Sequence, residues 1–356
     1  MKILITGICG FVGSRLAASI QERLPEVSIV GIDNLVRPGS ESNRAKLLSQ
    51  GIRFFHGDIR QPSDVDALPG CDWVVDAAAN PSVLAGIDGR SSVRQVSEHN
   101  LLGTLNMLEY CRVHKAGFLM LSTSRVYSIR DLAALPMRSA GNGFVLDCSV
   151  KDKVAGVSPA GISETFPTRP PISLYGATKL ASETMAVEYG QTFGFPVWVN
   201  RCGVLAGAGQ FGTAEQGIFS YWLHAHAARR PLRYIGFGGL GHQVRDAFHP
   251  EDLGDLLLMQ MKGDPEPDPI YNVGGGAANS MSLAQLTEWC DARFGRHQPE
   301  PDFRPRPFDI PWVIMDNGRV SERFGWKPQR TLSSILDDIA AHAEANPDWL
   351  TRSQAV

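Results

Sequence analysis

The sequence has little excess of charge of either sign. Its 34 lysine and arginine residues stand against 37 aspartate and glutamate residues, which leaves a net charge of −3 over 356 residues. A protein that binds nucleic acid or an anionic membrane through its overall field carries a marked positive excess. The balance therefore argues against both kinds of partner.

Long hydrophobic runs are also missing. A transmembrane helix needs about 20 consecutive apolar residues, and no such stretch occurs. The apolar run at residues 1–6 is far shorter than the apolar region of a signal peptide, and glycines follow it at once. We therefore expect a cytosolic protein whose first residues form a strand.

Cysteine is scarce, and its spacing forms no pattern. No Cys-x-x-Cys pair occurs, so the sequence predicts neither a zinc ribbon nor a disulfide framework. The six cysteines are Cys9, Cys71, Cys111, Cys148, Cys202 and Cys290. We expect reduced, buried thiols. His224 and His226 lie two residues apart in a helix-like segment, where they face different ways, so no metal site is expected.

Short β-branched, apolar runs alternate with helix-like segments through the first two thirds of the chain. The runs are residues 2–6, 28–32, 52–56, 73–77, 117–121 and 197–200, and the helix-like segments include 12–24 and 97–114. This alternation is typical of βαβ units. The sequence therefore predicts an α/β fold with a doubly wound parallel sheet, the Rossmann fold.

The composition and the hydrophobic pattern change at two points along the chain. Residues 128–172 are rich in proline and glycine, which predicts a long loop of the kind that covers a functional site. After residue 203 the alternation weakens. We expect residues 1–202 to be mainly a dinucleotide-binding domain with the insertion 128–172, and residues 203–356 to be mainly a smaller C-terminal substrate lobe, with some segments returning to the first domain.

Two features of the second half are expected to be structural. Trp222, Trp312 and Trp326 are expected to pack the C-terminal lobe rather than to stack on a base. The charges and alanines of residues 332–344 suggest a solvated cover helix.

The first strand ends in Thr6-Gly7-Ile8-Cys9-Gly10-Phe11-Val12-Gly13, which leads into an amphipathic helix. Glycines at these positions permit a tight turn and let a pyrophosphate approach the N–H groups at the helix N-terminus. The alternative is a strand, turn and helix with chance glycines. In this context the pattern predicts dinucleotide binding by Gly7, Gly10, Phe11, Val12 and Gly13.

An acidic residue supports that interpretation. Asp33 ends the second strand, 20 residues after Gly13, where a carboxylate accepts hydrogen bonds from the adenosine ribose and repels a 2′-phosphate. The sequence thus favours NAD over NADP, although Arg37 lies near enough in sequence to reach a 2′-phosphate. Asn34 belongs to the same strand end.

Two later strand ends complete the predicted cofactor site. Asp58 and Ile59 follow the third strand, where the adenine edge is expected, although a plain turn aspartate is the alternative. Ala77, Ala78 and Ala79 follow the fourth strand and leave room for the cofactor, or simply pack.

A tyrosine and a lysine lie four residues apart in Tyr175-Gly176-Ala177-Thr178-Lys179 and share one helical face. We expect the ammonium, together with an oxidised nicotinamide, to lower the pKa of the phenol, which then accepts a proton from a substrate hydroxyl while hydride leaves. Ser122 and Thr123 end the fifth strand, at the edge where doubly wound folds bind ligands. Outside this setting, a surface pair would be the better interpretation of Tyr175 and Lys179.

This combination of motifs resembles the extended short-chain dehydrogenase/reductases, in the group of NAD-dependent nucleotide-sugar epimerases and dehydratases. Further stretches resemble that family over nearly the whole chain. They are Asn100-Leu101-Leu102-Gly103-Thr104, the segment from Gln243 to Asp252 with Arg245 and His249, and Phe324-Gly325-Trp326-Lys327-Pro328.

The resemblance implies roles for individual residues. It places Thr123, Tyr175 and Lys179 at catalytic positions, and it adds Asn100, Ser122 and Arg201, with Tyr175 and Lys179, to the NAD-binding set. It places Ser124, Arg125, Gln210, Arg245 and Arg306 at the substrate. Arg245 takes the position of a diphosphate clamp, for which its charge and fork geometry suit it. A solvated loop charge is the alternative for Arg306.

Two local differences bear on the reaction. The dehydratases carry Asp-Glu after the catalytic threonine, because elimination needs an acid and a base, whereas this chain has Ser124-Arg125. The stretch from Arg201 to Phe211, followed by Glu215-Gln216-Gly217, is similar to the branch of CDP-paratose 2-epimerases. Val204 replaces an asparagine of many family members that helps bind the phosphates.

The leading hypothesis is therefore an NAD-dependent epimerase of a nucleotide-diphospho-sugar that works through a transient keto-sugar. A 4-epimerase and a net dehydrogenase or reductase are alternatives, and a dinucleotide-binding regulator is the non-enzymatic one. The intact set of Thr123, Tyr175 and Lys179 argues against a regulator. We expect no metal, and a homodimer or larger homo-oligomer.

Overall fold

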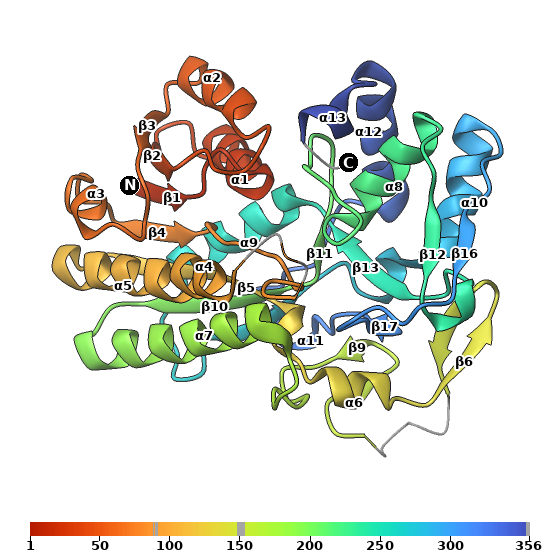
Figure 1. Cartoon of the computed structure of the whole chain (residues 1–356). Coiled ribbons are helices and arrows are strands. Elements are labelled where there is room, and N and C mark those ends of the chain that lie inside the picture. The colour runs from red at the N-terminus through yellow and green to blue at the C-terminus, as the bar shows by residue number, and fades with distance from the viewer. Residues whose placement is uncertain (88, 90–91, 148–153, 354–356) are drawn as a thin grey trace.

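The computed structural model describes residues 1–87, 89, 92–147 and 154–353. A large sheet with helices on both faces carries the N-terminus, and a group of shorter strands and helices beside it carries the C-terminus (Figure 1).

The large sheet has seven parallel strands in the order β14-β10-β5-β4-β1-β2-β3. The strands are β1 (Lys2–Thr6), β2 (Ser28–Asp33), β3 (Arg53–His56), β4 (Trp73–Asp76), β5 (Gly117–Thr123), β10 (Val197–Cys202) and β14 (Ile270–Val273). The first six are the runs that the sequence predicts, so the doubly wound parallel fold is confirmed. The seventh strand, β14, lies among weaker signals and was not predicted.

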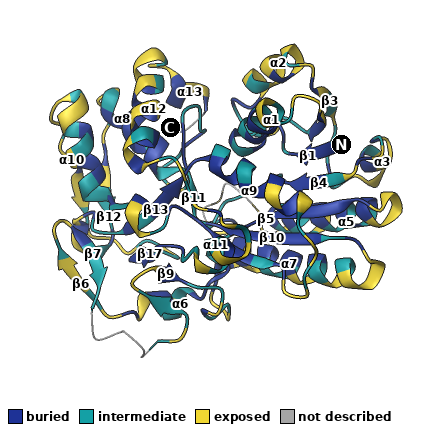
Figure 2. Cartoon of the chain, turned by 180° about the vertical axis from the view of Figure 1, so that it is seen from behind, coloured by how far each residue is buried: buried dark blue, intermediate teal, exposed yellow. Residues whose placement is uncertain are grey.

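Side chains of successive strand residues enter cores on opposite faces of this sheet. Ile3 and Ile5 of β1 face one core, and Leu4 faces the other. The first face is covered by α1 (Phe11–Arg23), α2 (Glu41–Ser49), α9 (Pro250–Lys262) and α11 (Gly318–Phe324). The second is covered by α3 (Pro62–Asp66), α5 (Gly103–His114) and α7 (Ser173–Phe193), and α4 (Val93–Ser97) leads into α5 through the π-helical turn η1 (Glu98–Leu102). The strands other than the edge strand β3 are therefore largely buried between helices whose outer sides are exposed (Figure 2).

The elements beside the large sheet are called the C-terminal lobe below. Its strands are β11 (Val204–Leu205), β13 (Val244–Phe248), β15 (Ser280–Ser282) and β17 (Trp312–Val313) in one sheet, with β12 (Arg233–Ile235) paired to β16 (Glu300–Asp302). Its helices are α8 (Ile218–Ala227), α10 (Leu283–Phe294), α12 (Leu332–Ala345) and α13 (Trp349–Arg352), and its 3-10 turns are η4 (Phe237–Gly239) and η5 (Ala277–Asn279). A further 3-10 turn, η2 (Ser124–Val126), directly follows β5 of the large sheet.

The expectation of a solvated cover helix over residues 332–344 was wrong in part. Helix α12 buries Ile335, Leu336 and Ile339 in the core of the C-terminal lobe, against α8. These residues recur at helical spacing, so they form one apolar stripe, while the charged residues occupy the other faces.

The expectation of a long loop over residues 128–172 also needs correction. The described part contains α6 (Ile129–Ala133) and the hairpins β6 (Met137–Ala140) with β7 (Gly143–Leu146) and β8 (Val157–Ser158) with β9 (Gly161–Ile162). Leu132, Ile162 and Phe166 are buried with Trp312 and Met315 in a core of their own. The insertion therefore folds because its apolar residues find partners in the C-terminal lobe.

Other structural expectations have mixed outcomes. Trp222 and Trp312 are buried where the C-terminal lobe packs, as predicted, but Trp326 packs against the large sheet's core beside Phe248. Five cysteines are free and buried, and Cys148 lies outside the described residues. Within the described chain, no helix has the length and apolar character needed to cross a bilayer.

Candidate active site

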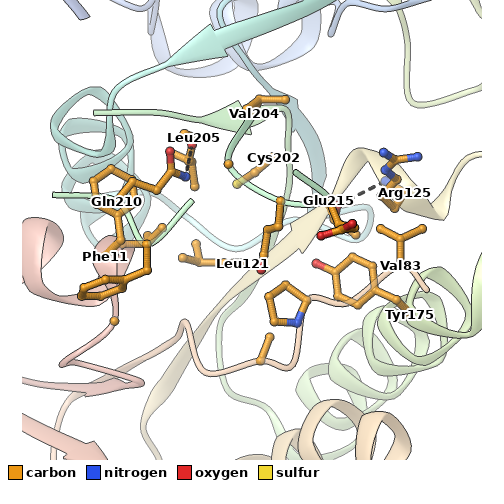
Figure 3. A pocket seen from close by; sticks show the side chains of 18 of the residues that line it. Phe11, Val83, Leu121, Arg125, Tyr175, Cys202, Val204, Leu205, Gln210 and Glu215 are labelled. Carbon is orange, nitrogen blue, oxygen red and sulfur yellow. Dashed lines mark hydrogen bonds between the residues drawn. The ribbon is translucent and has the colours of Figure 1, made fainter. Parts of the chain in front are cut away.

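A cavity of about 480 Å³ opens where the carboxyl ends of β1, β2, β4 and β5 meet the start of α1, and it continues between the large sheet and the C-terminal lobe. Its lining includes nearly all the residues that the sequence singled out. In Figure 3, Tyr175 and Arg125 lie toward one side of this cavity, and Phe11 and Gln210 lie toward the other.

The glycines of the first turn leave the cavity wall without side chains. Gly7 has φ +63°, and a Cβ there would lie 2.8 Å from the Cα of Ala78. A Cβ on Gly13 would lie 2.4 Å from the carbonyl oxygen of Gly7. Helix α1 begins after Gly10 with no side-chain cap, so its first N–H groups are free to meet an anion. These features fit the pyrophosphate of a dinucleotide.

The second strand brings its acidic residue to the same wall. The Asp33 carboxylate accepts hydrogen bonds from the backbone N–H groups of Cys9 (2.9 Å) and Leu35 (2.8 Å), which hold it beside the glycine turn. Burial raises the pKa of Asp33, and the backbone donors oppose that rise. A carboxylate fixed at this point fits the ribose of a dinucleotide.

Asp58 lines the same end of the cavity but is strongly bonded. It accepts from Asn34 (2.9 Å) and from the guanidinium of Arg60 (2.6 Å). Burial opposes ionisation, yet these hydrogen bonds hold the pKa of Asp58 below its usual range. Ile59 lines the wall beside it. Asp58 is therefore an ionised acceptor whose orientation Asn34 and Arg60 set.

The three alanines after β4 lie close to the glycine turn. The backbone N–H of Ala78 donates to the Thr6 hydroxyl (3.0 Å), which in turn donates to buried Asp76 (2.8 Å). Ala77, Ala78 and Ala79 all line the cavity. Small residues at this point keep the β1 and β4 ends close while leaving the space open.

Tyr175, Lys179 and Thr123 all line the cavity, where the start of α7 packs against the end of β5. Burial raises the pKa of Tyr175 to about 12, while a hydrogen bond with Thr123 and the charge of Arg125 oppose the rise. The expectation that Lys179, together with an oxidised nicotinamide, lowers this pKa stays a prediction for the protein with its cofactor. The ammonium donates to the carbonyl oxygen of Leu121 (2.9 Å), and burial lowers its pKa.

Two residues assigned to the cofactor lie elsewhere. Arg201 forms a buried ion pair with Glu183 (2.7 Å) and does not line the cavity. Glu183 also accepts a hydrogen bond from the hydroxyl of Ser122, which does line the cavity. Arg201 therefore contacts the cavity wall only indirectly, through Glu183. The resemblance marks the position of Arg201 in the chain but not the side to which its side chain turns.

Asn100 is the second predicted cofactor residue that does not line the cavity. Its side chain accepts from the backbone N–H of Asn80 (2.7 Å) and donates to the Asn80 carbonyl (3.0 Å) and to the Thr178 hydroxyl (3.1 Å). It is fully buried and ties the segment after β4 to helix α7. Asn100 therefore supports the site without touching the cavity.

Arginines gather at the substrate end. Arg245 forms an ion pair with Asp309 (3.4 Å), Arg306 donates to the carbonyl of Ala214 (2.9 Å), and Arg125 donates to the carbonyl of Phe308 (3.1 Å). Burial lowers the pKa of Arg245 to about 10. All three line the cavity, which gives this end an excess of positive charge suited to a diphosphate.

The remaining residues that were predicted to bind the substrate, Ser124 and Gln210, also line the cavity. Ser124 lines the cavity beside Arg125, and Gln210 lines it while donating to the carbonyl of Leu205 (2.8 Å), as Figure 3 shows. Val204 is part of the same wall.

Several cavity residues were not among the predicted site residues. They are His99, Gln216, Gln243, Met281, Ser282 and Leu283, among others. Gln243 lies two residues before Arg245, and the alternation of an extended chain would have placed both on one side. His99 and Met281 carry no comparable signal, because tertiary packing alone brings them here.

The two closely spaced histidines have separate partners. His224 contacts His342 (3.0 Å between ring nitrogens), whereas His226 pairs with Asp291 (2.9 Å). They point to different neighbours, as expected for residues two apart on a helix.

Comparisons with known proteins agree with this geometry. A family model described as the NAD dependent epimerase/dehydratase family matches residues 3–274. CDP-paratose 2-epimerase of Salmonella typhi is 29% identical over 349 residues, which cover 92% of this chain and 95% of that protein. UDP-glucose 4-epimerase of Corynebacterium glutamicum is 26% identical, with 98% and 97% covered. The structure of UDP-glucuronic acid 4-epimerase from Bacillus cereus, in complex with UDP-glucuronic acid and NAD, superposes with a TM-score of 0.76 at 22% identity over 97% of this chain and 99% of that one.

Proposed function

Because the chain belongs to the NAD-dependent epimerase/dehydratase family, we propose that it is an NAD-dependent epimerase of a nucleotide-diphospho-sugar. The observation that carries this proposal is the meeting of Tyr175, Lys179 and Thr123 in one cavity with Arg245 and Arg306. Acid–base residues serve the sugar hydroxyl, and the arginines serve the diphosphate.

The chain's own residues supply proton transfer and orientation. Tyr175 takes the proton of a sugar hydroxyl and returns it, and Thr123 hydrogen-bonds the phenol and the sugar oxygen. Gly7, Gly10, Gly13 and Asp33 would hold NAD at the cofactor end of the cavity, and NAD would supply reversible hydride acceptance at the sugar carbon. Its positive charge also favours the phenolate, which offsets the burial that raises the pKa of Tyr175.

The chain lacks the acid and the base that the dehydratases carry directly after the catalytic threonine. Ser124 and Arg125 follow Thr123, so neither an acid nor a base stands there. This supports epimerisation over dehydration.

The comparisons support two candidate positions for the inverted carbon, C2 and C4, and they support C2 more strongly. The similarity to CDP-paratose 2-epimerase over nearly the whole chain favours inversion at C2. The similarity to UDP-glucose 4-epimerase favours C4 and is lower. We therefore propose inversion at C2 of a CDP-sugar. A net dehydrogenase reaction is the alternative that the experiment must exclude.

A substrate screen tests the proposal. The purified protein is analysed by native mass spectrometry for bound NAD and then incubated with CDP-, UDP-, GDP- and dTDP-sugars in heavy water. We expect a product of unchanged mass, no carbon-bound deuterium, and no net formation of reduced cofactor. A product lighter by one water would indicate elimination, and steady growth of NADH absorbance would indicate a dehydrogenase. Either result would overturn the proposal.

We also propose a homodimer formed through α5 and α7. The two helices pack together and expose Leu102, Val113 and Phe193 on or beside them. Sedimentation velocity is expected to give twice the chain's mass of 38.8 kDa, and a Val113→Glu, Phe193→Glu double variant is expected to give the monomer. A monomeric parent protein would contradict this.

A further inference from the structure

A short segment of the C-terminal lobe forms one side of the cavity opposite the end of β2. Residues 210–217, between β11 and α8, line the cavity through Gln210, Phe211 and Gln216, among others. From the large sheet, Val36 and Arg37 line it just beyond Asp33. The two segments are nearly 180 residues apart in sequence.

Arg37 joins these two segments directly. Its guanidinium donates to the carbonyl oxygen of Phe211 and to the side-chain oxygen of Gln216 (3.3 Å). The link starts four residues after Asp33, at the end of the cavity that fits the ribose. A guanidinium held by two acceptors has fewer donors to offer a 2′-phosphate, so the alternative role of Arg37 in binding NADP is not favoured.

Packing at the same place is close. Gly39 has φ +89°, and a Cβ on it would lie 2.8 Å from the ring of Phe211. The Phe211 ring stacks on Trp349 (centroids 5.3 Å apart, planes 17° apart), and the Trp349 indole donates to the carbonyl of Gln210 (2.9 Å). Phe11, from the start of α1, belongs to the same cluster. Phe211 in the 210–217 segment thus packs between Gly39, which follows β2 of the large sheet, and Trp349 of the C-terminal lobe.

The substrate end anchors the same segment a second time. Arg306 donates to the carbonyl of Ala214 (2.9 Å) and lines the cavity beside Arg245. The segment therefore extends along both the predicted cofactor end and the predicted diphosphate end, with an arginine fastened to it at each.

We propose that Arg37 and the 210–217 segment form a clasp that retains the dinucleotide in the cavity between hydride removal and hydride return. This inference rests on the proposed function, because an epimerase that loses its reduced cofactor before return releases a keto-sugar and stops. Arg37 is a positioning residue in this account. It holds the two lobes together at the end of the cavity that fits the ribose and takes no part in proton transfer.

Release of NADH tests the clasp without any sugar. Parent protein and variants are loaded with NADH and mixed with excess NAD, and the fall in NADH fluorescence gives the release rate. We expect Arg37→Met to speed release by about tenfold or more, because charge-assisted hydrogen bonds across the opening are lost. Arg37→Lys is expected to restore part of the slow release.

A second variant and a matched control guard against misfolding. Gln216→Leu removes one acceptor and leaves the hydrogen bond from Arg37 to the carbonyl of Phe211, so a smaller increase is expected. Arg293→Met, at the exposed end of α10 where Arg293 pairs with Glu344, is expected to release NADH at the parent rate. An Arg37→Met variant that melts like the parent and releases NADH within about twofold of its rate would overturn the clasp, since loss of hydrogen bonds to a charged group has larger effects.

Turnover separates this inference from the proposed function. With a nucleotide sugar from the screen, Arg37→Met is expected to lose activity over successive turnovers and to regain it when NAD is added, which a general structural defect would not allow. A screen without any substrate would contradict the proposed function, while NADH release would still decide the clasp. Weaker NADP binding in Arg37→Met with unchanged NADH release would make Arg37 a phosphate ligand and overturn the clasp.

Discussion

Tyr175 is the side chain on which the proposed chemistry depends most directly. Replacement by phenylalanine removes the hydroxyl and keeps the ring, so the cavity wall and NAD binding are expected to remain. We expect the rate to fall by about 10²–10⁴-fold, the usual contribution of general acid–base catalysis. Steady-state rates and native mass spectra of Tyr175→Phe measure both effects.

The control for this change lies on the same helix. The Tyr189 hydroxyl bonds to Glu109 on the outer side, so Tyr189→Phe is expected to keep the parent rate. A Tyr175→Phe enzyme with more than about a tenth of the parent activity would exclude the phenol from proton transfer.

Asp33 is the residue expected to set cofactor preference. Asp33→Ala removes an acceptor from the ribose and a negative charge that repels a 2′-phosphate, so NAD is expected to bind more weakly and NADP relatively better. Titration of both cofactors into parent and variant gives the ratio of the two affinities. Asp66→Ala, on the exposed end of α3, is the control. An unchanged ratio in Asp33→Ala would show that another residue discriminates.

At the scale of elements, a buried ion pair joins β10 to α7 behind the catalytic residues. Arg201 and Glu183 are both nearly inaccessible, and Glu183 also accepts the hydroxyl of Ser122 at the end of β5. Arg201→Met leaves Glu183 charged and unpaired. We expect the free energy of unfolding to fall by about 3–5 kcal/mol, the typical result of removing one partner of a buried pair.

Urea denaturation of Arg201→Met and of Arg293→Met makes the comparison. Arg293 pairs with Glu344 at the surface, where solvent screens the interaction, so its variant is expected to keep the parent midpoint. Equal midpoints for all three proteins would show that the buried pair does not hold the two elements together.

At the scale of the whole molecule, Asp246 titrates where the large sheet meets the C-terminal lobe. Its Oδ2 accepts from the backbone N–H groups of Gly276 (3.0 Å) and Met315 (3.3 Å), and a Cβ on Gly203 would lie 2.9 Å from Oδ1. Burial raises the pKa of Asp246 from 3.8 to about 6. The folded protein therefore binds this proton more tightly than the unfolded chain does.

The stability of the molecule should depend on pH accordingly. The contribution of the protonated carboxyl is fully present below about pH 4 and is lost as the pH rises through about 6, and at 1.36 kcal/mol per pKa unit it is roughly 3 kcal/mol. Asp246→Asn keeps an acceptor without the charge, so its free energy of unfolding is expected to lack this decline. Urea denaturation between pH 4 and 8 measures the difference between the two proteins, and parallel curves would contradict the assignment.

Local rules in the sequence determined much of the architecture and of the cofactor end. Hydrophobic periodicity located six of the seven parallel strands, because each pattern spans only a few residues. The turn with Gly7, Gly10 and Gly13 and the acid Asp33 were recognisable because backbone conformation and helix starts depend on neighbouring residues. The spacing of Tyr175 and Lys179 likewise placed both on one helical face.

Tertiary structure alone decided where side chains with distant partners turn. Arg201 pairs with Glu183 and Asn100 with Asn80, so neither reaches the cavity. The described part of the insertion 128–172 folds, and Arg37 meets Phe211, only because segments far apart in sequence pack together. A short stretch of sequence encodes its own backbone preference, whereas a buried side chain is directed by whichever charge or apolar surface the completed fold brings to it.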